Sequence, residues 1–180
     1  MEEKIVYLEK AGQENTATTF DVVERALSEL DIHKVVLAST RGDTARYALE
    51  HYQGQDVQLI VVPHQYGFGP GQRFPPELVA RAESEGHVVH FGTMLFHQEK
   101  TWGEGPAQAV ANFLRLFCQG VKVCVEILLM AGNAGLVDPG EQVVVVAGTG
   151  RGADTALVMK GSTTRDLKSA HISRILCKPL

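Results

Sequence analysis

The sequence predicts an α/β domain of three layers, α/β/α, in which helices cover both faces of a mostly parallel sheet. The first observation is that apolar runs of strand length alternate with segments whose apolar residues recur at helical spacing. This alternation is typical of parallel strands joined by right-handed crossovers. The second is that the chain finishes with two strand-like runs and no helix-length insert between them, which predicts an antiparallel edge. We expect residues 1–180 to form one domain, because this length buries a full core.

The first half of the chain holds three strand–helix pairs and a further strand. The expected strands are 4–10, 34–39, 57–63 and 87–93, and the expected helices lie within 15–31, 44–52 and 76–86. Two of these strands, 34–39 and 57–63, are continuous apolar runs of the kind that sheets bury on both faces. Asn15 or Thr16 is the expected N-cap of the first helix. The third helix has proline in its first turn and Gly86 after its last.

The second half begins with a helical region from 106 to about 134, in which Gly120 is the expected break or join. Strands follow at 142–148, 153–161 and 172–179. Within the helical region, Lys122 and Glu126 are spaced i, i+4 on an otherwise apolar surface, which favours a partly buried ion pair over a catalytic carboxylate. The apolar segment around them suits either the core or an interface, and burial preferences favour the core.

Composition narrows the classes of partner. The net charge of −4 and the pI near 6 argue against nucleic acid, which requires a basic face, although a small anion needs only a local positive spot. Neither a secretion signal nor an apolar run long enough for a bilayer is visible. The three cysteines form no CxxC pair and indicate reduced thiols, so we expect a cytoplasmic protein.

Unusual loops follow all four strands that are expected to be parallel. These loops are "STRGDT" (39–44), "HQYGFGPG" (64–71), "GTMLFHQ" (92–98), which includes Thr93, and "GTGRGADT" (148–155). The connections at the other end of the strands are short and plain. Because ligands of open α/β sheets bind outside the carboxyl ends of the strands, where the winding reverses, we expect one composite crevice there.

The loop "STRGDT" has the groups of an anion site at a helix start. Hydroxyls, a guanidinium and a close backbone approach come from Ser39, Thr40, Arg41, Gly42 and Thr44. The alternative is a purely structural turn, in which Asp43 or Thr44 caps the helix and Gly42 makes the bend. The charge of Asp43 counts against phosphate, because it competes for the same donors.

The loop "GTGRGAD" fits the spacing of a dinucleotide fingerprint but not its context. The fingerprint opens a crossover helix, whereas a strand follows here, and no Lys-Ser/Thr pair makes a P-loop. We therefore expect the second wall of the anion pocket, with Gly42 as its floor and Arg151 reaching in. The residues assigned to this wall are Gly148, Thr149, Gly150, Arg151, Gly152, Asp154 and Thr155.

The loop after the second parallel strand carries His64, Tyr66, Gly67 and Phe68. These aromatic residues either stack on a planar ring or pack across the loop. The seven histidines show no metal-ligand spacing, so no metal site is expected. No spacing indicates a nucleophile with its base; His64, at a strand end, is the candidate proton carrier if the protein is an enzyme.

Four stretches carry a resemblance to a known family. "NTATTFDVVERALSELDIHKVVLASTRGDTARYA", "VVPHQYGFGPG", "RLFCQGVKVCVEILLMAGNAGLV" and "VVVVAGTGRGADTALVMKG" together resemble the C-terminal α/β domain of pyruvate kinase as a stand-alone protein. The resemblance implies that the four parallel strands lie in the order 3-2-1-4 with an antiparallel edge strand. It also implies a phosphate site: "STRGDTA" matches the effector loop at Ser39, Gly42, Thr44 and Ala45 and departs from it at Arg41 and Asp43.

The resemblance and the loops together predict binding of a phosphorylated small molecule. FMN, another mononucleotide or a sugar phosphate fits, and FMN is favoured if "HQYGF" and Trp102 cover a ring system. The alternative is an enzyme acting on a phosphorylated or carbonyl metabolite, with Arg41 or Arg151 holding the anion and His64 moving the proton. The resemblance covers no catalytic barrel, so pyruvate kinase activity is not expected. The related kinase domain helps to form a subunit interface, so the resemblance also implies a homo-oligomer.

Overall fold

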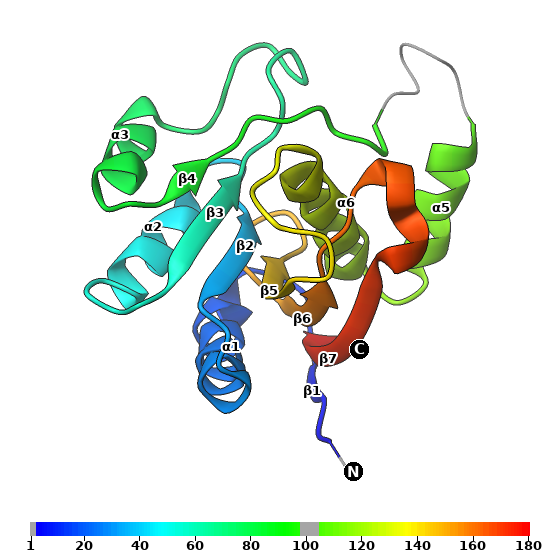
Figure 1. Cartoon of the computed structure of the whole chain (residues 1–180), viewed down its shortest axis with the longest axis horizontal. Helices are drawn as coiled ribbons and strands as arrows, with labels where there is room; N and C mark the ends of the chain where they lie inside the picture. The colour runs from blue at the N-terminus through cyan, green and yellow to red at the C-terminus, as the bar shows by residue number, and fades with distance from the viewer. Residues whose placement is uncertain (1–2, 98–104) are drawn as a thin grey trace.

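The computed structural model describes residues 3–97 and 105–180 (Figure 1). Trp102, predicted to cover a ring system, lies outside these residues. The strands are β1 (Val6–Leu8), β2 (Lys34–Ala38), β3 (Gln58–Val62), β4 (Val88–Val89), β5 (Gln142–Ala147), β6 (Thr155–Lys160) and β7 (His171–Pro179). The α-helices are α1 (Thr16–Leu30), α2 (Asp43–His51), α3 (Pro76–Ser84), α5 (Pro106–Arg115) and α6 (Gln119–Asn133). Two 3₁₀ helices are η1 (Gln13–Asn15) and η2 (Thr164–Ser169).

The strands form one sheet in the order β1-β7-β6-β5-β2-β3-β4. Its β4-β3-β2-β5 part is the predicted 3-2-1-4 order, and these four strands are parallel, as expected. The predicted antiparallel strand exists, but its place at the edge was wrong. The antiparallel strand β6 lies between β5 and β7, and β1 pairs in parallel with β7 beyond it. The amino-terminal strand β1 therefore forms this edge of the sheet, in place of the carboxyl-terminal strands.

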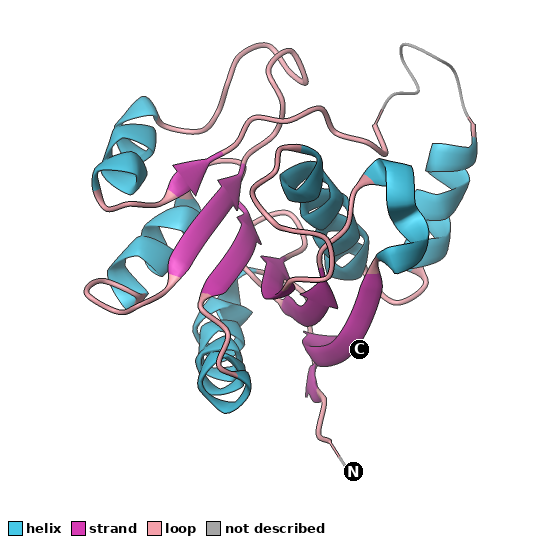
Figure 2. Ribbon diagram, in the orientation of Figure 1, coloured by secondary structure: helices cyan, strands magenta, loops and turns pink. Residues whose placement is uncertain are grey.

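Helices cover both faces of this sheet, which confirms the three-layer prediction (Figure 2). On one face, α1, α2 and α3 share a core cluster with Val35 and Leu37 of β2. On the other, α6 packs over Val36 of the same strand. Successive strand residues point to opposite faces, so a continuous apolar run supplies both cores at once.

Two expected boundaries differ from the structure. The strand predicted at 87–93 is reduced to Val88–Val89, with the chain continuing as a loop toward the sheet end. The helical region divides into α5 and α6 at residues 116–118, so Gly120 is not the break. Gly120 lies inside α6, at a position where a Cβ would be 2.0 Å from Thr155 Oγ1. Its role is to let α6 approach β6 closely.

The apolar segment of α6 belongs to the core, as predicted. Cys124, Leu128 and Ala131 are fully buried against the sheet. None of the described helices is long and apolar enough to cross a bilayer.

Candidate functional site

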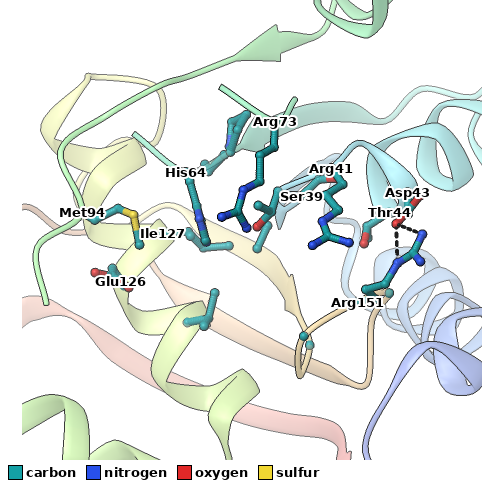
Figure 3. Close-up of a pocket in the computed structure, with 18 of the residues that line it drawn as sticks. Ser39, Arg41, Asp43, Thr44, His64, Arg73, Met94, Glu126, Ile127 and Arg151 are labelled. Atoms are coloured by element: carbon teal, nitrogen blue, oxygen red, sulfur yellow. Dashed lines mark hydrogen bonds and ion pairs between the residues drawn. The ribbon is translucent and has the colours of Figure 1, made fainter. Parts of the chain in front are cut away.

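A pocket of about 290 Å³ lies at the carboxyl ends of the parallel strands, between β2 and β5 (Figure 3). The strand order reverses at this point, because β3 lies on one side of β2 and β5 on the other. All four predicted loops contribute to the pocket, and α6 forms a further wall. The lining residues are Ala38, Ser39, Thr40, Arg41, Asp43, Thr44, Val62, Pro63, His64, Arg73, Met94, His97, Gln119, Val123, Glu126, Ile127, Met130, Gly148, Gly150, Arg151 and Gly152.

The loop between β2 and α2 brings a helix start and hydroxyl groups to the pocket. Ser39 is buried, and its Oγ accepts a hydrogen bond of 3.1 Å from the N–H of Ala45 in the first turn of α2. Neither Asp43 nor Thr44 is the cap that the structural alternative expected, since Gly42 holds that position. The hydroxyl hydrogen of Ser39 remains available to an acceptor, and the first N–H groups of a helix have no partner within it.

The prediction that Gly42 forms the pocket floor was wrong. This residue is buried but is not among the lining residues. A Cβ at Gly42 would lie 2.5 Å from Leu78 Cδ1 and 3.0 Å from Pro75 Cδ. Gly42 therefore faces the start of α3, and its lack of a side chain allows α2 and α3 to pack together.

Three arginines reach the pocket, and they differ in their partners. The Nε and Nη2 atoms of Arg151 donate to Asp43 Oδ2 at 3.0 and 2.8 Å. Arg41 and Arg73 form no ion pair with any described residue. Figure 3 shows their guanidinium groups near Ser39. Arg151, the side chain expected to reach in, is paired with Asp43, whereas Arg41 and Arg73 have no carboxylate partner among the described residues.

The wall formed by residues 148–155 is held in shape by Asp154. This carboxylate is fully buried and accepts hydrogen bonds from the N–H groups of Gly12 and Thr149, at 3.0 and 3.1 Å. It also accepts one of 2.8 Å from the Thr155 hydroxyl. Asp154, Thr149 and Thr155 were predicted as ligand contacts, but none lines the pocket. They position Gly148, Gly150 and Gly152, which do.

The aromatic residues after β3 mainly pack across their own loop. The ring of Phe68 lies edge-on to His64 and His97, with centroid distances of 4.6 and 5.4 Å. Tyr66 is 66% exposed and packs on Phe91. Of the predicted residues Thr93, His64, Tyr66, Gly67 and Phe68, only His64 lines the pocket. Burial lowers the pKa of His64 below its ordinary value, and repulsion from His97 when both rings are protonated lowers it further.

The inner wall is formed by α6 and carries a buried ion pair. Lys122 Nζ lies 2.5 Å from Glu126 Oε2, which confirms the predicted pair. The other carboxylate oxygen, Oε1, accepts a hydrogen bond of 2.8 Å from the Phe96 N–H and lies 3.3 Å from His97 Nδ1. Burial opposes ionisation of Glu126, but the His97 hydrogen bond and the Lys122 charge outweigh it and lower its pKa.

Sequence reasoning did not assign one cation, two residues of the loop after β4 or the α6 wall to the site. These residues are Arg73, then Met94 and His97, and then Gln119, Val123, Glu126, Ile127 and Met130. Arg73 follows an irregular loop whose path no periodicity predicts. The α6 contribution has a signal, because two charged residues on an apolar helix beside a sheet end are unusual. Among the described residues, no group of three His, Cys, Asp or Glu side chains forms a metal cluster.

Comparison with known proteins gives consistent matches. A family model described as the pyruvate kinase alpha/beta domain matches residues 17–159. A solved structure of a pyruvate kinase from Cryptosporidium parvum matches with a TM-score of 0.44 and 14% sequence identity. A structure of the same organism's pyruvate kinase in complex with ADP matches with a TM-score of 0.42 and 15% sequence identity. Both matches cover 86% of this chain, but only 24% and 25% of the solved ones. The chain thus spans about a quarter of the length of these proteins.

Proposed function

The chain belongs to the family of pyruvate kinase α/β domains, and on this premise we propose that it binds a phosphorylated small molecule in the pocket between β2 and β5. The ligand class that the pocket favours is a sugar phosphate. Its phosphate would lie against Ser39 and the start of α2, between Arg41 and Arg73. Its carbon body would extend toward α6.

The observation that carries this proposal is an excess of positive charge among the side chains that line the pocket. The chain has a net charge of −4, yet two arginines without a carboxylate partner in the described chain line one cavity. The other charges there are matched, because Arg151 pairs with Asp43 and Lys122 with Glu126. Two guanidinium groups that converge near a helix start suit the two charges and the oxygen acceptors of a phosphate.

The opposite end of the pocket suits an uncharged carbon chain. Met94, Val123, Ile127 and Met130 supply an apolar surface there. A second phosphate on this surface would lose its water, and the ammonium group at this end, Lys122, is already paired with Glu126, so its burial is unfavourable. A ligand with one phosphate and a short uncharged body fits both ends.

The size of the cavity and the aromatic residues favour a sugar phosphate over FMN. A volume of about 290 Å³ lies at the lower limit of ligand pockets. A flavin ring needs apolar or aromatic faces, but Tyr66 packs on Phe91 and Phe68 packs between two histidines. FMN is therefore the competing ligand in the test below.

The proposal is tested by calorimetry and thermal unfolding with four ligands: ribose 5-phosphate, glucose 6-phosphate, fructose 1,6-bisphosphate and FMN. Unphosphorylated ribose is the control. A ligand at 100 times its Kd raises the free energy of unfolding by about 2.7 kcal/mol. Arg41→Ala and Arg73→Ala are each expected to weaken binding by about 10- to 100-fold, because hydrogen bonds to charged groups are lost. Flavin absorbance in the purified protein would favour FMN instead.

Arg25→Ala is the matched control, because it removes the same charge from α1, outside the pocket lining. Its affinity should equal that of the unmodified protein. Ribose binding as tightly as ribose 5-phosphate, or arginine variants that bind normally, would contradict the proposal. The predicted homo-oligomer is a separate question, which sedimentation of the purified protein tests.

A further inference from the structure

Three ionisable side chains meet at the α6 end of the pocket. Lys122 Nζ and Glu126 Oε1 each lie 3.3 Å from the Nδ1 atom of His97. The lysine side chain is fully buried and the glutamate side chain is 3% exposed, whereas the histidine side chain is 22% exposed. The cluster is therefore closed on its α6 side and accessible at the imidazole, and both Glu126 and His97 line the pocket.

Stability alone is a weak account of this cluster. A buried ion pair loses so much hydration that replacing it with apolar side chains is often neutral or stabilising. The surrounding α6 surface is apolar, with Val121 and Ile127 buried beside the pair, so an apolar pair would be compatible with the core. The pair instead holds an imidazole in place at the wall of a cavity.

The contacts at Nδ1 leave the other ring nitrogen free to exchange a proton. The His97 Nε2 atom has no hydrogen-bond partner among the described residues. When Nδ1–H donates to Glu126, Nε2 carries a lone pair and is a base. When Nδ1 accepts from Lys122, Nε2 carries the hydrogen and is a donor. Either tautomer is satisfied at Nδ1, and the Glu126 carboxylate holds the ring in its orientation.

A second imidazole lines the same pocket. His64 and His97 lie on either side of the Phe68 ring, which contacts both edge-on. Burial and neighbouring positive charge lower the pKa of His64. The neutral His64 imidazole can therefore donate a hydrogen bond to an oxygen of the ligand, because neutral imidazole carries one N–H.

We propose that His97 is the general base and acid of a proton transfer on the bound sugar phosphate, with Glu126 and Lys122 as positioning residues. The reaction class is enolisation, the interconversion of a hydroxy-aldehyde and a hydroxy-ketone. This inference rests on the proposed function, because Arg41 and Arg73 would hold the phosphate and so place the carbonyl end near the two histidines.

The step balances without an oxidant or a reductant. His97 Nε2 takes the proton from the carbon beside the carbonyl, and the electron pair of that C–H bond forms a C=C bond. The carbonyl π electrons move to oxygen, which takes a proton from His64, and an enediol results. His97 returns its proton to the former carbonyl carbon, while His64 recovers one from the neighbouring hydroxyl. The aldehyde thus becomes a ketone, and both histidines regain their starting states.

Exchange of the ligand's carbon-bound hydrogen with D₂O, followed by proton NMR, tests this step on ribose 5-phosphate, glucose 6-phosphate and fructose 1,6-bisphosphate. We expect deuterium to enter the carbon beside the carbonyl of a ligand that binds. His97→Gln should slow this exchange by at least about 100-fold, a typical general-base contribution, and leave the Kd within about threefold. His171→Gln, at the exposed start of β7, should change neither.

Glu126→Gln separates positioning from folding. It should shift the pH profile of the exchange as well as lower its rate, because the charge beside Nδ1 changes; a purely structural role would leave the profile in place. Sugar phosphates that bind but exchange no faster than in buffer would overturn the inference and leave the proposed binding intact. If none of the sugar phosphates binds, the proposed function fails and this inference with it.

Discussion

Arg151 and Asp43 join two walls of the pocket across 108 positions of sequence. The guanidinium donates twice to a single carboxylate oxygen, so the loop after β5 is tied to the first residue of α2 (Figure 3). Asp43 lines the pocket beside the proposed phosphate position and competes for the cation that a ligand would use.

We therefore predict that Asp43→Asn strengthens binding of the sugar phosphate by about three- to tenfold at low salt. The change removes a negative charge near the phosphate and releases Arg151, and charge interactions at a partly exposed site are of this size. Titration calorimetry at two salt concentrations measures the effect, which should shrink at the higher one. Asp21→Asn, on the exposed side of α1, is the control. Weaker binding by Asp43→Asn would show that the pair instead shapes the site.

A second prediction concerns two glycines of the wall. Gly150 and Gly152 have positive φ angles of 80° and 68°, so alanine is strained at both. Only at Gly152 would a Cβ meet other atoms, Thr16 Oγ1 at 2.5 Å and Gln13 Cα at 2.6 Å. Gly152→Ala should therefore lower the free energy of unfolding by about 1–3 kcal/mol more than Gly150→Ala. Urea unfolding measures both, and equal losses would argue against the close approach of η1 to this wall.

The third prediction is a pH dependence that comes from Glu126. Its pKa is lowered below the ordinary 4.5, with burial outweighed by the contacts to His97 and Lys122. The stability that this carboxylate adds is therefore present above the unfolded pKa and is lost as the pH falls through the folded one. Glu126→Gln should destabilise by about 3 kcal/mol near neutral pH, because it leaves the buried Lys122 charge unbalanced.

Urea unfolding over a pH series checks this expectation. The difference in unfolding free energy between the two proteins should shrink as the pH falls below the ordinary pKa of 4.5 and through the lower pKa of the folded protein. Glu29→Gln, an exposed change on α1, should give a gap near zero throughout. If the loss of unfolding free energy in Glu126→Gln stays constant down to acid pH, the loss comes from a change in packing and not from the lost charge.

The cysteines supply a fourth prediction. Burial raises the pKa of Cys177 to about 11 and that of Cys124 well above its ordinary value, whereas Cys118 is partly exposed. Both buried thiols stay protonated at mildly alkaline pH, and the thiolate is the reactive form. A thiol reagent at about pH 8 should react quickly with one cysteine at most, and with all three after denaturation. Cys118→Ser should remove the fast reaction, and a fast reaction that persists would refute the assignment.

Local patterns in the sequence were sufficient for the architecture. Continuous β-branched runs such as 34–39 are stable only when both faces are covered, and their alternation with helices leaves few topologies. The edge at which their loops meet follows from that, whereas the order of the four parallel strands was an implication of the family resemblance. The exception was β1, three residues long, whose pairing with β7 depends on the opposite end of the chain.

The sequence by itself determined where the pocket lies, because the carboxyl ends of parallel strands meet at one edge of the sheet whatever the side chains are. Only the tertiary structure decided which charged side chains of the pocket have a partner of opposite charge. Among the described residues, Arg151 has a carboxylate partner and Arg73 has none, because side-chain pairing depends on distances across loops far apart in sequence. The same holds for Glu126: helical spacing predicts its bond to Lys122, but only the packing of α6 against the strand ends brings it to His97 and the pocket.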